Sequence, residues 1–301
     1  MKNFSQFLNE TAATKRQGIV HLQKMKDLDF IDFVKKIKPQ LKDNFLNVHV
    51  SLKVDGLGAR FGKNINGRFF FEGSRTGPIF TPKSFSSFHK QKGTTDEILL
   101  QRADHYDNMF DLLRTQNFVK NLPNNVKVVC EIFYNPMAEK TKAGFKFVNV
   151  VYDRSRLGET MTIVLLDVLN SDTGEQLKNK NEIISQLKKS SNKEIQIQTV
   201  ELRINKSIDI SGVVDPVLSL NQDLIFALSS RKKADKAHKE NAKAIVQNVK
   251  DQLADYLLKS EHIDGKFLLG PEFEGLILKF DDNLVKITTP EFKKAFAAKR
   301  G

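Results

Sequence analysis

The sequence contains a single cysteine, Cys130, among its 301 residues. One thiol excludes a disulfide within the chain, and no group of cysteines and histidines has zinc-site spacing. No apolar run approaches the roughly 20 residues that cross a bilayer, and the N-terminus lacks the basic start and apolar stretch of a signal peptide. We therefore expect no structural zinc, no membrane span and no secretion. The expected location is the cytoplasm, or the host cytoplasm if a phage encodes the chain.

Positive charge exceeds negative charge, with 48 Lys and Arg against 36 Asp and Glu and a formal net charge of +12. Such a chain is attracted to polyanions, because binding releases their condensed counterions. Nucleic acid is the leading candidate partner, although many basic proteins bind none. The balance of 40% hydrophobic and 28% charged residues is typical of a globular protein, which we expect to be a monomer.

The hydrophobic pattern predicts an α+β fold. Apolar residues recur at helical spacing over 27–37 and alternate with polar ones over 46–54, with Leu46 on the apolar side and Lys53 on the polar side. Further strands are predicted at 68–73, 127–134, 145–152, 161–169, 195–204, 274–279 and 283–287, and further helices at 96–119 and 180–188. We interpret 222–262 as a helical insertion in a single domain that spans 1–301.

Five short elements follow one another along the chain. They are Lys53-Val-Asp-Gly56, Ser74-Arg-Thr-Gly-Pro-Ile79, Cys130-Glu-Ile-Phe133, Glu274-Gly-Leu-Ile-Leu-Lys279 and Val285-Lys-Ile287. The first alone is a common tetrapeptide, which a surface lysine before a tight turn would explain. The ordered set resembles the nucleotidyltransferase motifs of ATP-dependent DNA ligases, RNA ligases and mRNA-capping enzymes. The resemblance implies an ATP-grasp-like adenylation domain with two antiparallel sheets flanked by helices. DNA ligases and capping enzymes normally append an OB-fold, but only about 15 residues follow Lys286, so we expect none here.

The resemblance makes Lys53 the nucleophile that accepts AMP from ATP. Attack on a phosphoanhydride needs an unprotonated amine, whereas a free lysine has a pKa of about 10.4. A neighbouring cation lowers the pKa of such an amine, because like charge disfavours the ammonium form. Lys286 is expected to be this cation and to hold the α-phosphate.

The resemblance also implies a set of nucleotide contacts: Asp55, Gly56, Arg60, Arg75, Glu131, Phe147, Lys279 and Lys286. It makes Glu131 and Glu274 the ligands of Mg²⁺ or Mn²⁺, since a carboxylate beside buried strand positions is costly unless it is paired or metal-bound. For the Asp-Gly pair an ordinary turn is an equal alternative. For Arg60 the alternative is a plain strand residue.

The chain departs from the family pattern at three places. Thr288 stands where many members have a second lysine, so that phosphate contact is lost or moves to Lys279 or Lys293. DNA ligases have an arginine at the position of Gly58. Residues 163–167 lack the aromatic that stacks on adenine, a role that Phe147 or Tyr152 would take unless aliphatic side chains enclose the base.

A basic stretch lies within the predicted insertion, where 229–259 hold eight Lys and Arg against four Asp and Glu. A helix there would contact nucleic-acid phosphates through six residues: Arg231, Lys232, Lys233, Lys236, Lys239 and Lys243. A solvated charged helix is the alternative.

These observations predict an ATP-dependent polynucleotide ligase that joins 5′-phosphate and 3′-hydroxyl ends through a lysyl-AMP intermediate. Asp55 and Ser74 slightly favour DNA nicks as its substrate. Arg-Thr-Gly-Pro-Ile, which begins at Arg75, resembles phage RNA ligases, so joining of RNA ends is the alternative. A catalytically inactive nucleic-acid-binding protein of the same fold is a second alternative.

Overall fold

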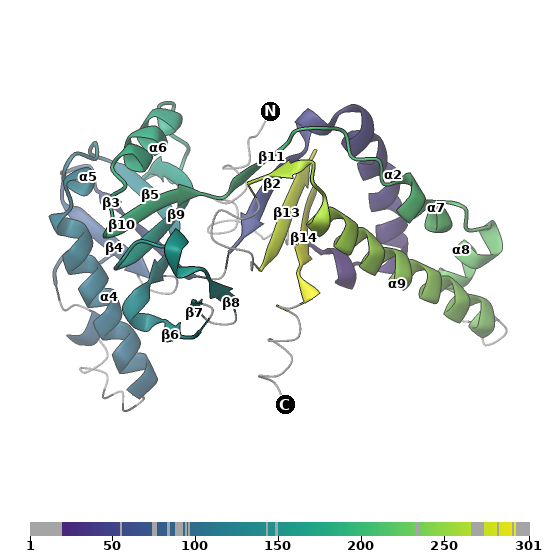
Figure 1. The fold of residues 1–301 in the computed structure, drawn as a ribbon, viewed down its shortest axis with the longest axis horizontal. Helices are drawn as coiled ribbons and strands as arrows, with labels where there is room; N and C mark the ends of the chain where they lie inside the picture. The colour runs from purple at the N-terminus through teal and green to yellow at the C-terminus, as the bar shows by residue number, and fades with distance from the viewer. Residues whose placement is uncertain are drawn as a thin grey trace. The chain divides into compact units, whose positions relative to one another are not determined.

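The computed structural model describes residues 20–54, 56–73, 77–82, 85–87, 93, 95, 97–142, 144–147, 150–230, 232, 235–265, 274–281, 283–290 and 292. The protein has a mixed α+β fold with three sheets (Figure 1). Its contacts divide the chain into two compact units. The first unit contains Val54–Val200, and the second contains Arg16–Lys53, Glu201–Leu268 and the described residues of Phe273–Gly301.

The second unit contains a six-stranded sheet. Its strands, in spatial order, are β1 (Val20–His21), β14 (Asn283–Thr288), β13 (Gly275–Phe280), β2 (His49–Lys53), β11 (Glu201–Ile204) and β12 (Ile263–Asp264). Neighbours run antiparallel, except that β1 is parallel to β14. The helices of this unit are η1 (Leu22–Lys24), α2 (Asp27–Asp43), η2 (Phe45–Asn47), α7 (Ser211–Leu218), α8 (Gln222–Ser229) and α9 (Lys236–Lys259).

One face of the six-stranded sheet is apolar because alternate residues of β2, β13 and β14 are apolar. Helix α2 packs on it, with the ring of Phe33 centred 5.5 Å from that of Phe280. Helix α9 packs in turn on α2. Between them the buried amine of Lys250 donates to Asp27 Oδ1 at 2.8 Å and to the Met25 carbonyl at 2.6 Å. The opposite face of the sheet carries Lys53, Ser51 and Lys286, together with the apolar Ile277.

The first unit contains a five-stranded sheet and a small three-stranded one. The larger has, in spatial order, β10 (Ile195–Thr199), β9 (Met161–Asn170), β5 (Val126–Tyr134), β3 (Leu57–Lys63) and β4 (Phe69–Gly73), with β10 parallel to β9. The smaller has β6 (Glu139–Lys140), β7 (Phe145–Phe147) and β8 (Val150–Tyr152). The described helices of this unit include α4 (Glu97–Thr115), α5 (Asn117–Lys120), α6 (Lys180–Lys189), η3 (Asn135–Met137) and η4 (Arg154–Arg156).

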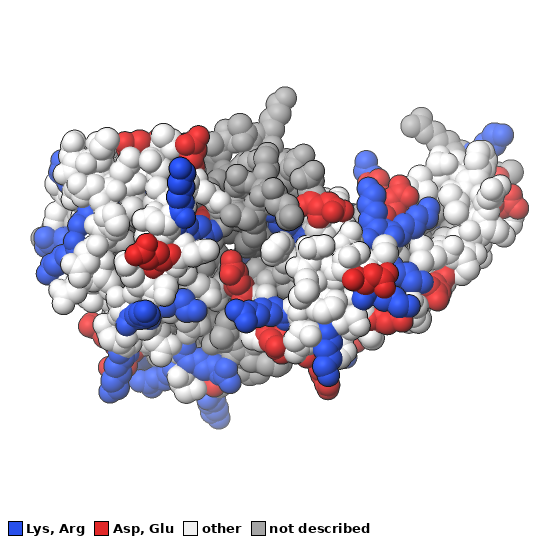
Figure 2. Space-filling model, turned by 90° about the horizontal axis from the view of Figure 1, so that it is seen from above, with Lys and Arg blue, Asp and Glu red and all other residues white. Residues whose placement is uncertain are grey.

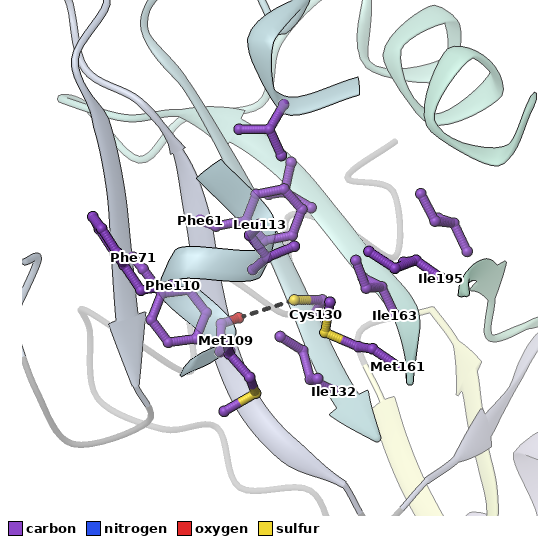
Figure 3. Close-up of a cluster of buried hydrophobic side chains, with 14 of the residues drawn as sticks. Phe61, Phe71, Met109, Phe110, Leu113, Cys130, Ile132, Met161, Ile163 and Ile195 are labelled. Atoms are coloured by element: carbon purple, nitrogen blue, oxygen red, sulfur yellow. Dashed lines mark hydrogen bonds between the residues drawn. The ribbon is translucent and has the colours of Figure 1, made fainter. Parts of the chain in front are cut away.

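The core of the first unit lies between the five-stranded sheet and its helices. Phe61 and Phe71 of the sheet lie against Phe110 of α4, and Cys130 lies among them (Figure 3). The thiol of Cys130 donates to the carbonyl of Ala59 at 3.5 Å. Cys130 is therefore a core side chain.

The structure corrects several predicted elements. The described residues form three sheets rather than the expected two, and two of these sheets include a parallel pair. Leu46 belongs to η2 and is exposed, so β2 begins only at His49. The predicted strand 145–152 is the hairpin of β7 and β8. The predicted strand 195–204 is β10 followed by β11, which belong to different sheets.

Two further expectations concern the domain division and membrane spans. The single domain with a helical insertion stays a prediction, because compact contact units within one chain do not show whether either folds alone. Among the described helices, none is both long and apolar enough to cross a membrane.

Candidate active site

Lys53 is the last residue of β2, and its side chain lies on the polar face of the six-stranded sheet. It is paired across the sheet with Gly275, the first residue of β13. This register brings Glu274 beside Lys53, with Glu274 Oε2 at 2.9 Å from Lys53 Nζ. The glutamate side chain is only 4% exposed, whereas that of Lys53 is 28% exposed. The amine of Lys53 is therefore accessible and its carboxylate partner is not.

Lys286 approaches the same carboxylate from the other side. It lies on β14 and donates to Glu274 Oε1, and its Nζ lies 5.6 Å from the ring centre of Phe292. Two ammonium groups thus share one carboxylate, which leaves this triad with one positive charge. A cationic site with a buried counter-charge is suited to hold an anion such as a phosphate.

The backbone around Glu274 fixes the position of its carboxylate. Its carbonyl accepts a hydrogen bond from the Thr289 amide at 3.0 Å. The next residue must be glycine, because a Cβ on Gly275 would lie 1.9 Å from the carbonyl oxygen of Ile287. The Glu-Gly pair of the motif therefore has a packing reason: the glycine lets β14 come close enough for Lys286 to reach Glu274.

Lys279 and Ser51 also belong to the polar face, because each is an even number of residues from Gly275 or Lys53 on the same strand. Lys279 is buried and pairs with His49, four residues from Lys53 along β2. The buried hydroxyl of Ser51 has no hydrogen-bond partner among the described residues. The motifs did not single out Ser51, although strand alternation places it beside Lys53.

The first unit brings together a second group of predicted residues. Glu131 of β5 pairs with Gly58, and Arg60 follows on the same face of β3. Gly56 lies against the acid, since a Cβ there would be 3.4 Å from Glu131 Oε2. Arg60 Nη1 lies 3.6 Å from the carboxylate of Glu72. The roles of these residues in nucleotide binding stay predictions.

Phe147 is a core residue in this structure. Its ring packs against Phe133 at 5.0 Å and Tyr152 at 6.1 Å, and all three are buried between the small sheet and β5. A ring buried in this way does not present a face to adenine. The structure thus gives no support to either aromatic as the base-stacking residue.

The predicted basic helix is α9 with the segment before it. Lys236, Lys239 and Lys243 lie in its first two turns, and Lys232 is exposed just before it. Lys239 donates to the Ser230 carbonyl at 2.6 Å, and Lys236 Nζ lies 3.8 Å from Glu240 Oε1. Acidic side chains also lie among the basic ones on the face shown in Figure 2. Part of this positive charge is therefore neutralised within the protein.

Several predicted site residues lie outside the described residues. They are Asp55, Arg75, Arg231, Lys233 and Lys293. Their expected roles stay predictions.

Glu274 could hold a divalent cation if one of its two lysine partners moved away. Mg²⁺ is commonly held by one or two carboxylates together with substrate phosphates and waters, so a single buried acid is sufficient on the protein side. Both oxygens of Glu274 are engaged by lysines, so an ammonium group must give way to the metal. Within the described parts of the chain, no three His, Cys, Asp or Glu side chains gather into a metal cluster.

No protein-family model matches the sequence, and no curated protein matches it either. Solved structures of RNA ligase from Naegleria gruberi match 95% of the chain at 12% identity. They include a mutant without ligand (TM-score 0.38, 57% of that chain), a mutant with ATP and Mn (0.35, 58%) and a mutant with AMP and Mn (0.34, 57%). The chain thus spans less than two thirds of these ligases, and similarity at this level assigns neither an activity nor a substrate.

Proposed function

We propose that the protein is an ATP-dependent nucleotidyltransferase in which Lys53 accepts AMP, the first step of polynucleotide end joining. The observation that carries the proposal is the shared carboxylate of Glu274 between Lys53 and Lys286. It supplies a partly exposed lysine side chain and a second cation beside the same carboxylate, and Lys53 must lose its proton before it attacks a phosphate. The ordered sequence motifs, of which these three residues are members, support the same chemistry.

In the proposed first step, Lys53 Nζ attacks the α-phosphorus of ATP. A P–N bond forms, the bond to the bridging oxygen breaks, and pyrophosphate leaves with the electron pair while the amine gives up a proton. Lys286 neutralises charge on the α-phosphate oxygens, and Glu274 orients the attacking amine. Glu274 would help to hold Mg²⁺ or Mn²⁺, whose contribution is to neutralise charge on the triphosphate, and the role of Glu131 as a metal ligand stays a prediction.

The later steps transfer AMP from Lys53 to a 5′-phosphate end, after which a 3′-hydroxyl displaces AMP and forms the phosphodiester. We propose RNA and DNA ends as the two candidate substrates. Arg-Thr-Gly-Pro-Ile favours RNA, and the solved structures named above are RNA ligases, which agrees with the RNA alternative. A nick-sealing assay with all-DNA and RNA-containing nicks, each with the same sequence, separates the two.

The direct test of the proposal is labelling with α-labelled ATP and Mg²⁺. We expect label on the wild-type protein and on Lys36→Ala, which removes an exposed lysine of α2, and none on Lys53→Ala. The label should be lost in acid and kept in alkali, as a phosphoramidate requires. Label that persists on Lys53→Ala would overturn the assignment of the nucleophile.

A nucleic-acid-binding protein without catalysis is the second candidate. Thr288 favours it, because this residue stands at the end of β14 where many family members have a second phosphate-binding lysine. Strand binding by a wild-type protein that takes no label from ATP would favour this candidate over the ligase.

A further inference from the structure

The face of the five-stranded sheet opposite its helices carries three basic residues in regular order. Arg60 on β3 is opposite Glu72 and Val129, and Lys127 on β5 is opposite Gly62, two residues further along β3. Arg68 follows at the next step, where its carbonyl accepts the Asn64 amide. Directly opposite residues in an antiparallel sheet share a face, and steps of two residues are about 6.8 Å apart. We name Arg60, Lys127 and Arg68 the β3 cation row.

The row lies on the same face as Glu131, one step beyond it. Glu131 pairs with Gly58, and Gly58 and Gly62 are the residues on either side of Arg60 on this face of β3. A side chain cannot replace the second glycine, since a Cβ there would lie 1.9 Å from the Val126 carbonyl oxygen. Arg60 is therefore flanked by bare backbone along its strand.

Glu72 is the acid within the row. Its carboxylate lies 3.6 Å from Arg60 Nη1 and 4.0 Å from Lys127 Nζ, so it holds two of the three cations in place. The side chains of Arg60 and Lys127 are still 30% and 20% exposed. Ion pairs that are this exposed contribute little to stability, and both cations can still reach a ligand in solvent.

The far end of the row combines charge with a flat apolar surface. The guanidinium of Arg68 lies 4.9 Å from the centre of the Phe80 ring, which in turn packs on Phe70 at 6.3 Å. Arg68 is exposed and has no carboxylate partner among the described residues. Stacked guanidinium and aromatic groups of this kind accept the flat face of a base while the charge attracts phosphate.

We propose that the β3 cation row binds the phosphodiester backbone of a polynucleotide strand, with Arg68 and Phe80 against a base. Three cations against one internal acid, lying on or next to three neighbouring strands, suit a ligand that carries several single negative charges. The direction of the strand, with its reacting end toward Glu131, rests on the proposed function. The binding itself does not.

The test measures binding of labelled single-stranded RNA and single-stranded DNA of one sequence to the full-length protein without ATP, across a salt series. Lys127→Gln and Arg68→Gln should each weaken binding by about three- to tenfold and lower the slope of log affinity against log salt by about 0.7. Lys188→Gln on α6 and Arg102→Gln on α4 remove matched exposed charges from the helices on the other face. These controls should stay within about twofold of wild type.

Glu72→Gln gives a test with the opposite sign. Removing the acid frees Arg60 and Lys127, so strand binding should tighten, an outcome that partial unfolding cannot imitate. If Lys127→Gln and Arg68→Gln bound the strand as tightly as their controls, the proposed binding role of the β3 cation row would be wrong. Weaker binding by Glu72→Gln with unchanged thermal unfolding would also contradict it. The binding assay contains no ATP and does not depend on Lys53. If the Lys53 labelling test failed, the proposed function would be wrong, but the result of the binding assay would still stand.

Discussion

Lys53 and Glu274 form an ion pair at 2.9 Å although they come from strands at opposite ends of the sequence. The pair exists because β13 returns alongside β2 with Gly275 opposite Lys53. Since Lys286 shares the same carboxylate, removing Glu274 would leave two neighbouring ammonium groups without their counter-charge. Glu274 therefore holds the proposed nucleophile in position and offsets the repulsion between the two ammonium groups.

Glu274→Gln should abolish labelling of Lys53 by ATP and lower the free energy of unfolding by about 1–3 kcal/mol. This is less than the 3–5 kcal/mol typical of a broken buried pair, because Lys53 is partly exposed and solvent screens its charge. Glu261→Gln, which removes an exposed acid of the same unit, is the control and should leave both properties unchanged. Denaturant unfolding and the labelling assay measure the two effects. Normal labelling of Glu274→Gln would contradict the role given to this acid.

Gly275→Ala should destabilise the second unit by at least about 2 kcal/mol, because its Cβ would overlap the Ile287 carbonyl and push β14 away from β13. The control is Gly212→Ala in α7, where nothing lies within 4 Å of the new Cβ. That substitution should stabilise the protein by about 0.5–1 kcal/mol, since alanine favours helix over glycine. Thermal unfolding of the two variants compares them directly. Equal stabilities would show that β13 and β14 tolerate a wider spacing.

Most of the elements followed from the sequence, and the failures have physical causes. The apolar alternation of 195–204 continues through Val200, which is itself buried, so nothing in the pattern marks the change from one sheet to another. Leu46 continues the alternation of β2 but lies in η2, because alternation does not show where pairing to another strand begins.

For the candidate site, the sequence indicated the residues but not all of the contacts between them. The motifs named Lys53, Glu274 and Lys286 separately, but they did not show that Glu274 would connect the two lysines. Phe147 could be recognised as a large ring near the motifs. Its burial against Phe133 depends on which face of β5 the small sheet covers, and the sequence pattern does not contain that information.

Because of Cys130, the free energy of unfolding of the first unit should depend on pH in the alkaline range. Burial among apolar side chains, and secondarily the charge of Glu131, raise the pKa of its thiol in the folded state. An unfolded thiol ionises near pH 8.5, so above this pH the unfolded state has lost a proton that the folded state keeps. The free energy of unfolding should therefore fall by about 1.4 kcal/mol per pH unit above pH 8.5 relative to Cys130→Ala. Parallel pH profiles of the two proteins would refute this linkage.

Lys250 and Asp27 should be strongly coupled in stability. Asp27→Asn would leave the buried ammonium of Lys250 without its carboxylate partner and with the Met25 carbonyl as an acceptor, and the expected cost is about 2–4 kcal/mol. Lys250→Met in the same chain removes the charge while keeping a side chain of similar volume, so the double variant should regain most of that loss. A double-mutant cycle from denaturant unfolding measures the coupling, expected at about 1.5–3 kcal/mol. A coupling below about 0.5 kcal/mol would mean that apolar contacts, rather than this ion pair, hold α9 on α2.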